Sequence, residues 1–75
     1  MNTETLKTLR TEYKEFQYQT KILLRRIAVM ELKRRNPELE EIGSSDVSIA
    51  LYDLRKELGS WEEVMHYGRT QYGIS

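Results

Sequence analysis

Few residues of this 75-residue chain could perform acid–base, nucleophilic or metal chemistry. There is one histidine, His66, and no cysteine, so thiol catalysis and thiolate metal sites are excluded. A single imidazole with Glu62 and Glu63 as companions would leave a metal ion short of ligands. The adjacent pair Glu40 and Glu41 diverges by about 100° on a helix and does not converge on one substrate atom. We therefore expect no catalytic residues, no cofactor and no metal, and the chain is not expected to be an enzyme.

Charged side chains are segregated along the chain although the formal net charge is zero. Residues 17–36 carry six bases and one acid, whereas residues 37–63 carry eight acids and two bases. In one interpretation, the acidic half folds back on the basic half and neutralises it. In the other, a basic patch stays open for phosphate groups or an acidic protein. The residues of this patch are Arg25, Arg26, Lys33, Arg34 and Arg35.

The aromatic residues near the C-terminus are candidates for binding a partner protein. Trp61, Arg69 and Tyr72 have the composition of interface hot spots, although the tryptophan could instead complete a small core. Tyr72 and Ile74 follow Gly68, where we expect the last helix to weaken, and they are the better candidates for an anchor. Truncation after Gly68 is therefore expected to leave the fold intact and to weaken partner binding.

The elements that must position these residues are expected to be helices. Pro37 is the only proline, and all four glycines follow residue 36, so the first half has no strong helix breaker. Gly59 is expected to end one helix, and Ser60 with Glu63 forms a capping box for the next. The sequence predicts one all-α domain over residues 1–75, in which shorter elements pack along a long helix. The expected elements are a long helix at about 4–35, a short helical turn at 37–42, and helices at about 45–58 and at 61–67 or 61–72.

The long helix carries an apolar stripe that is typical of lengthwise helix packing, either in an ordinary core or in a coiled coil. Its residues alternate three and four apart: Leu6, Leu9, Tyr13, Phe16, Thr20, Leu23, Ile27 and Met30. From residue 22 to residue 32, apolar side chains cover nearly every side. The helix would be about 50 Å long, whereas a compact chain of this size is about 30 Å across, so we expect a second copy to cover it. The expected oligomer interface, most simply of a homodimer, consists of Leu23, Leu24, Ile27, Ala28, Met30 and Leu32.

These patterns favour a small, non-catalytic regulator or inhibitor that binds a larger protein. The small size is typical of proteins from phages and mobile elements, and the absence of an apolar run or signal-peptide core predicts a cytoplasmic location. One alternative is a nucleic-acid-binding module that uses the Lys33-Arg34-Arg35 cluster. A helix-turn-helix formed by the last two helices is less consistent with the residues, because only Arg69 and Gln71 there suit base edges. The other alternative is a structural oligomer subunit.

Overall fold

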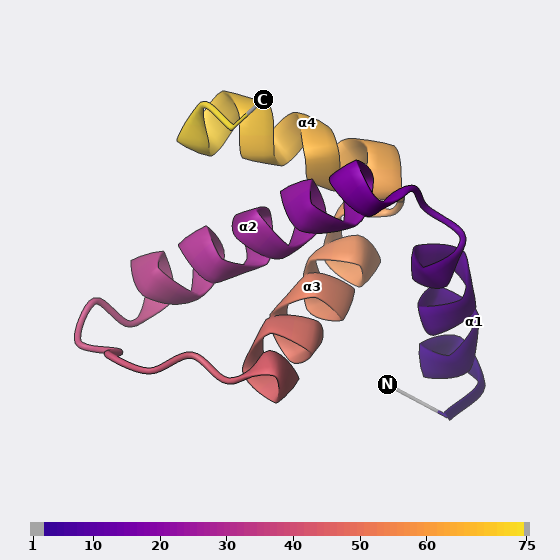
Figure 1. The fold of residues 1–75 in the computed structure, drawn as a ribbon, viewed down its shortest axis with the longest axis horizontal. Coiled ribbons are helices and arrows are strands. Elements are labelled where there is room, and N and C mark those ends of the chain that lie inside the picture. The colour runs from indigo at the N-terminus through magenta and orange to yellow at the C-terminus, as the bar shows by residue number, and fades with distance from the viewer. Residues whose placement is uncertain (1–2, 75) are drawn as a thin grey trace.

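Four helices make up the protein in a computed structural model that describes residues 3–74, with side chains from residue 5 onward. The helices are α1 (Thr3–Lys14), α2 (Tyr18–Arg35), α3 (Ser44–Leu58) and α4 (Trp61–Tyr72), and the described range contains no strand. The predicted all-helical class is confirmed. The prediction of one long helix at 4–35 is wrong, because that segment forms two helices that point in different directions (Figure 1).

The chain breaks between α1 and α2 because Phe16 turns into the core. The N–H groups of Glu15 and Phe16 donate to carbonyls three residues back, at 3.3 and 3.2 Å, which is the tight pattern of a final helical turn. Gln17 is extended, with φ −65° and ψ 156°. The Phe16 ring meets Trp61 edge-on, with 5.9 Å between ring centroids. A straight rod of about 50 Å could not bury these rings together with α2 in a body of 33 × 24 × 22 Å.

α2 is the central helix of the fold. It packs against α3 and α4, which also pack against each other, while α1 lies across one side (Figure 1). Leu24, Ile27 and Ala28 of α2 are fully buried in this arrangement. They share one core with apolar residues of the other helices and of the C-terminal segment: Leu9, Val47, Ala50, Leu51, Tyr52, Leu54, Trp61, Val64 and Ile74.

This core corrects the expected oligomer interface. Leu24, Ile27 and Ala28 are covered by the chain itself and are not open to a second copy. Leu23 and Leu32 are half-buried against the same core, and of the six expected residues Met30 is the one that is exposed, at 39%. Because α2 is about 27 Å long, the chain is large enough to cover one face of it. The argument that a second copy must enclose a 50 Å rod is therefore wrong.

Residues 36–43 form a loop, so the predicted helical turn at 37–42 is wrong. The N–H of Leu39 donates to the Asn36 carbonyl at 3.1 Å, which closes a single turn. A segment this short does not offset the cost of helix nucleation. Three neighbouring carboxylates also repel one another here: Glu38, Glu40 and Glu41. The half-buried side chain of Ile42 packs on the core and leads into α3.

The junction between α3 and α4 follows the predicted signals. Gly59 has φ +93°, a left-handed conformation that suits glycine at the end of a helix. The Ser60 side chain accepts a hydrogen bond from the N–H of Glu63 at 3.1 Å. The predicted helix end and the predicted N-terminal cap are both confirmed.

α4 continues through Gly68 to Tyr72, the longer of the two predicted extents. Gly68 lies where α4 crosses α2, and a Cβ atom there would stand 2.4 Å from Cδ1 and Cγ1 of Ile27. Its role is close helix packing, not helix termination. Ile74, beyond α4, is 6% exposed and belongs to the core. The expectation that Ile74 is a free anchor is therefore wrong, and we now expect truncation after Gly68 to destabilise the fold because it removes this core residue.

Candidate functional site

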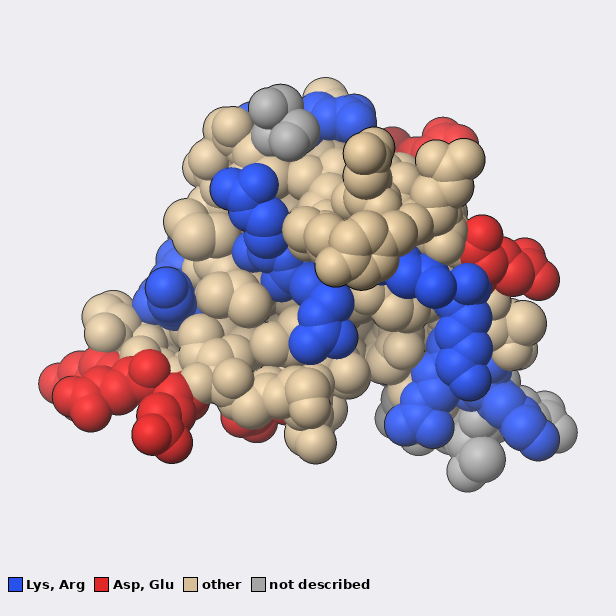
Figure 2. Space-filling view, in the orientation of Figure 1, with Lys and Arg blue, Asp and Glu red and all other residues tan. Residues whose placement is uncertain are grey.

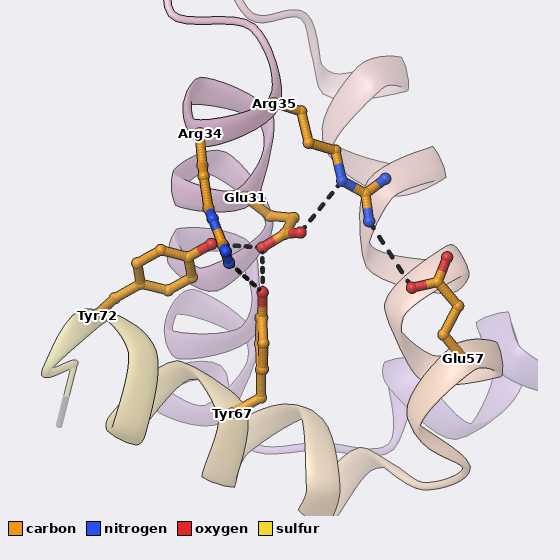
Figure 3. Close-up of polar contacts among 6 residues, drawn as sticks. All are labelled: Glu31, Arg34, Arg35, Glu57, Tyr67 and Tyr72. Atoms are coloured by element: carbon orange, nitrogen blue, oxygen red, sulfur yellow. Dashed lines mark hydrogen bonds and ion pairs between the residues drawn. The ribbon is translucent and has the colours of Figure 1, made fainter.

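The C-terminal end of α2 carries a closed polar cluster (Figure 3). Its centre is the buried carboxylate of Glu31, which accepts hydrogen bonds from the Tyr67 hydroxyl at 2.7 Å and from the Tyr72 hydroxyl. The Arg35 Nε donates to the other carboxylate oxygen at 3.1 Å. Arg34 Nη1 donates to the Tyr67 hydroxyl at 3.0 Å. These contacts fasten the last turns of α4 to α2.

The protonation states of Glu31 and Tyr67 follow from burial, hydrogen bonds and nearby charge. Burial alone would raise the pKa of Glu31, but hydrogen bonds from Tyr72 and Tyr67 and the positive charge of Arg35 outweigh it and lower the pKa. Burial and the hydrogen bond to Glu31 raise the pKa of Tyr67. Around neutral pH the carboxylate is therefore ionised and the phenol is protonated. The cluster has the features of a structural contact that holds α4 against α2.

Two of the predicted partner-binding cations are occupied by this cluster. Arg35 also forms an ion pair with Glu57 of α3, at 3.7 Å between Nη2 and Oε2. Arg34 is held in the cluster by the hydrogen bond that its Nη1 donates to the Tyr67 hydroxyl. Lys33 is exposed, and no ion pair joins it to the described residues. At this end of α2, one acid of the acidic half, Glu57, therefore pairs with one base of the basic half.

The outward face of α2 borders a groove of about 480 Å³. The groove runs between this face and the end of α4, and its lining consists of apolar side chains, two arginines and a glycine: Ile22, Arg25, Arg26, Val29, Met30, Tyr72, Gly73 and Ile74. We call it the α2–α4 groove. Ile22 and Met30 are 40% and 39% exposed. No acidic residue is part of the lining, so the groove combines an apolar floor with positive charge.

The arginines of the groove are open to solvent. Arg25 and Arg26 are exposed, and neither forms an ion pair within the part of the chain that the structure describes. Figure 2 shows Lys and Arg side chains spread over one face of the molecule, while acidic side chains gather toward its edges. The acidic half therefore leaves this part of α2 uncovered.

The remaining predicted partner residues have different positions. Trp61 is 6% exposed, and its ring lies among those of Tyr13, Phe16 and Tyr52 at 5.9 to 6.2 Å between centroids. Its prediction as a free binding residue is wrong, and the alternative that it completes the core is confirmed. Arg69 is exposed on α4, whereas Tyr72 is half-buried and lines the groove while its hydroxyl binds the Glu31 cluster.

Sequence reasoning missed three residues that matter at these sites. Glu31 lies seven residues after Leu24 and four after Ile27, so it shares their inward face, and this spacing could have identified it. Ile22 and Val29 are seven residues apart, with the arginines between them. That spacing places them together on the opposite face, but a helix that is apolar on both sides does not say which side stays open.

The described residues contain no group of three or more His, Asp or Glu side chains that could hold a metal ion. No helix in that part of the chain is long and apolar enough to cross a membrane. Comparison of the chain with protein-family models, curated proteins and solved structures finds no match.

Proposed function

We propose that this chain is a non-catalytic protein-binding regulator or inhibitor that docks on a larger protein through the α2–α4 groove. The observation that carries the proposal is the groove itself, where exposed apolar side chains lie beside two arginines without ion-pair partners among the described residues. Apolar anchors rimmed by charge are typical of protein–protein interfaces, and arginine is enriched in their hot spots.

The chemistry of the groove favours, as its partner, an amphipathic helix with an acidic edge. Ile22, Val29 and Met30 recur along α2 at the spacing of a helix-packing ridge, so a second helix could lie lengthwise on them. Arg25 and Arg26 lie within that ridge and would pair with carboxylates of the partner. A basic helix would bring like charges together and is disfavoured.

A second copy of this chain is the competing occupant, which would make the chain a structural oligomer. α3 presents Ile49, which is 61% exposed, with Asp46 three residues before it and Asp53 four residues after it. Ile49 and these two aspartates together combine apolar and acidic character. Ile49 is a single apolar side chain, however, whereas a groove with several apolar side chains favours a partner that presents a longer ridge.

The test measures binding of labelled helical peptides by fluorescence anisotropy. One peptide carries leucines at three- and four-residue spacing with flanking glutamates, and the other has lysines in place of the glutamates. We expect the acidic peptide to bind and the basic one to bind at least about tenfold more weakly. The double variant Ile22→Ser/Met30→Ser should weaken the acidic peptide about tenfold, because it removes apolar contacts without changing the charge.

Ile49→Ser is the matched control, because it removes an exposed apolar side chain outside the groove. It should change the affinity by less than about twofold. Equal binding of both peptides, or an equal effect of Ile49→Ser, contradicts the proposal. A dimer in analytical ultracentrifugation that Ile22→Ser/Met30→Ser dissociates would identify the second copy as the occupant and would also overturn it.

A further inference from the structure

A second positively charged surface lies on the α1 side of α2. Basic residues at three- and four-residue spacing follow one face of α1 and continue on the first turns of α2. We call them the basic band: Lys7, Arg10, Lys14, Lys21 and Arg25. Lys21 is half-buried and the other four are exposed, and none forms an ion pair with a described residue. Arg25 lies where the band meets the α2–α4 groove.

The two helices bring these cations together on one face. Lys21 Nζ lies 6.0 Å from the centre of the Tyr13 ring of α1, and the Tyr13 hydroxyl donates to the Lys21 carbonyl at 3.3 Å. Burial raises the pKa of Tyr52, while the nearby positive charges of Arg10 and Arg25 act in the opposite direction. Arg10 of α1 and Arg25 of α2 therefore both lie near Tyr52. Figure 2 shows Lys and Arg side chains spread across this face among uncharged ones.

The acidic residues of α1 and the following turn differ in their relation to the band. Glu12 forms an ion pair with Arg55 of α3, with 3.8 Å between Glu12 Oε1 and Arg55 Nη2. Glu15 is exposed in the turn and reduces the positive charge locally. Among the side chains that the structure describes, the band has five bases and Glu15 is the one exposed acid of α1 and this turn, so the described band is cationic.

Tyr18 is an aromatic side chain that stands out from this charged surface. It is 76% exposed, more than Ile22, Met30 or Ile49, and contributes little to the core. It begins α2, four residues after Lys14 and three before Lys21. An exposed ring between cations is the arrangement by which proteins stack bases while pairing with the phosphates on either side.

We infer that the basic band and Tyr18 bind single-stranded nucleic acid, a function beyond the protein docking proposed above. The cations of the band pair with backbone phosphates, and a base stacks on the Tyr18 ring. A duplex keeps its base faces stacked inside and cannot use the tyrosine, so single strands bind more tightly. Phosphate pairing and stacking on a ring face do not depend on base identity, and the recognition is therefore tolerant of sequence.

The test measures fluorescence anisotropy of labelled oligothymidine and oligouridine of about 20 nucleotides and of a duplex of similar length. Five phosphate contacts give a log–log salt slope of about −3.5, so affinity for the single strands should fall about 100-fold between about 50 and 200 mM salt. The duplex should bind more weakly than either single strand. Oligothymidine against oligouridine shows whether the band distinguishes DNA from RNA.

Variants distinguish binding at the basic band from general electrostatic attraction to the protein. Arg10→Glu/Lys14→Glu should weaken oligothymidine binding at least about tenfold. Lys56→Glu/Arg69→Glu, which makes the same charge change on α3 and α4, should weaken it less than about threefold. Tyr18→Ala should cost about fivefold or more, and Tyr18→Phe should restore the binding because the ring is kept.

Three results would overturn the inference. They are the absence of single-strand binding at low salt, an equal effect of the two charge-reversed pairs, and an unchanged affinity in Tyr18→Ala. Ile22→Ser/Met30→Ser leaves the band intact and should not affect oligothymidine binding. The outcome is therefore independent of whether the groove binds an acidic helix.

Discussion

The inward and outward faces of α2 both carry apolar side chains, but their charged side chains differ in whether they have partners within the described residues. On the inward face, the charge of Glu31 is buried, ionised and held by hydrogen bonds from α4 and from Arg35. On the outward face, Arg25 and Arg26 are exposed and form no ion pair with the described residues. Removing one member of a partnered buried group destabilises a fold strongly, whereas charge left open beside apolar surface is available for binding.

The largest expected effect breaks the inward face at Glu31. Glu31→Ala removes the shared acceptor of Tyr67, Tyr72 and Arg35 and leaves the two phenol hydroxyls without it, while Arg35 keeps its ion pair with Glu57. We expect the free energy of unfolding to fall by about 3 kcal/mol, a large part of the roughly 4–11 kcal/mol expected for a chain of this size. Urea denaturation followed by circular dichroism at neutral pH measures the change. Glu31→Gln, which keeps the shape and one acceptor, should lose less, and a loss below about 1 kcal/mol for Glu31→Ala would mean that the cluster is not structural.

The next largest effect tests the packing of the inward face at Gly68. In Gly68→Ala, the new Cβ would lie 2.4 Å from two carbons of Ile27, which is fully buried. We expect a loss of about 2 kcal/mol, because the overlap outweighs the gain of about 1 kcal/mol in helix propensity.

Two comparisons isolate the clash at Gly68 from general effects of the substitution. Gly43→Ala, where the Cβ would meet only Asp46 at 3.6 Å, creates no clash and should cost about 1 kcal/mol or less, because alanine is a poorer N-cap for α3. In thermal unfolding, Gly68→Ala combined with Ile27→Ala should cost less than the sum of the two single changes. An additive result would show that the close approach is not the reason for the glycine.

The helical class, the α3–α4 junction and its cap were predictable because each has a local signal. Gly59 requires a left-handed conformation, and Ser60 stands three residues before Glu63. The break at Phe16 has no such signal, since the segment contains neither glycine nor proline. It depends on the contact of Phe16 with Trp61, more than forty residues later in the chain.

The α2–α4 groove was only partly predictable, because it too depends on contacts between residues far apart in the sequence. Arg25 and Arg26 could be found from charge segregation alone. Ile22 and Leu24 are equally apolar in sequence, but α3 and α4 cover Leu24 and leave Ile22 40% exposed. Which face of α2 stays open is decided by the positions of other helices, and one helix's own pattern does not contain that information.

A smaller expected effect of the inward face is a loss of folding stability in acid, caused by protonation of Glu31. The pKa of Glu31 in the folded protein lies below its ordinary value of 4.5. Its stabilising contribution is therefore complete above about pH 4.5 and is lost as the pH falls further. Urea denaturation between about pH 3 and 7 should show stability decreasing on acidification, with a smaller decrease in Glu31→Gln. An identical pH profile in both proteins would show that Glu31 does not bind protons differently on folding.

The smallest expected effect on stability lies on the outward face, and it separates the two faces most sharply. The neighbours of Arg26 at helical spacing are Ile22, Leu23, Val29 and Met30, none of them charged. Arg26→Glu therefore breaks no ion pair with a described residue and should change the free energy of unfolding by less than about 0.5 kcal/mol. The same variant should weaken the acidic helical peptide at least about tenfold, because a carboxylate in the groove repels its glutamates. Urea denaturation and peptide anisotropy on one protein sample measure both quantities. A loss of stability above about 1 kcal/mol would assign Arg26 to the fold, and the distinction between a structural inward face and a binding outward face would then no longer hold.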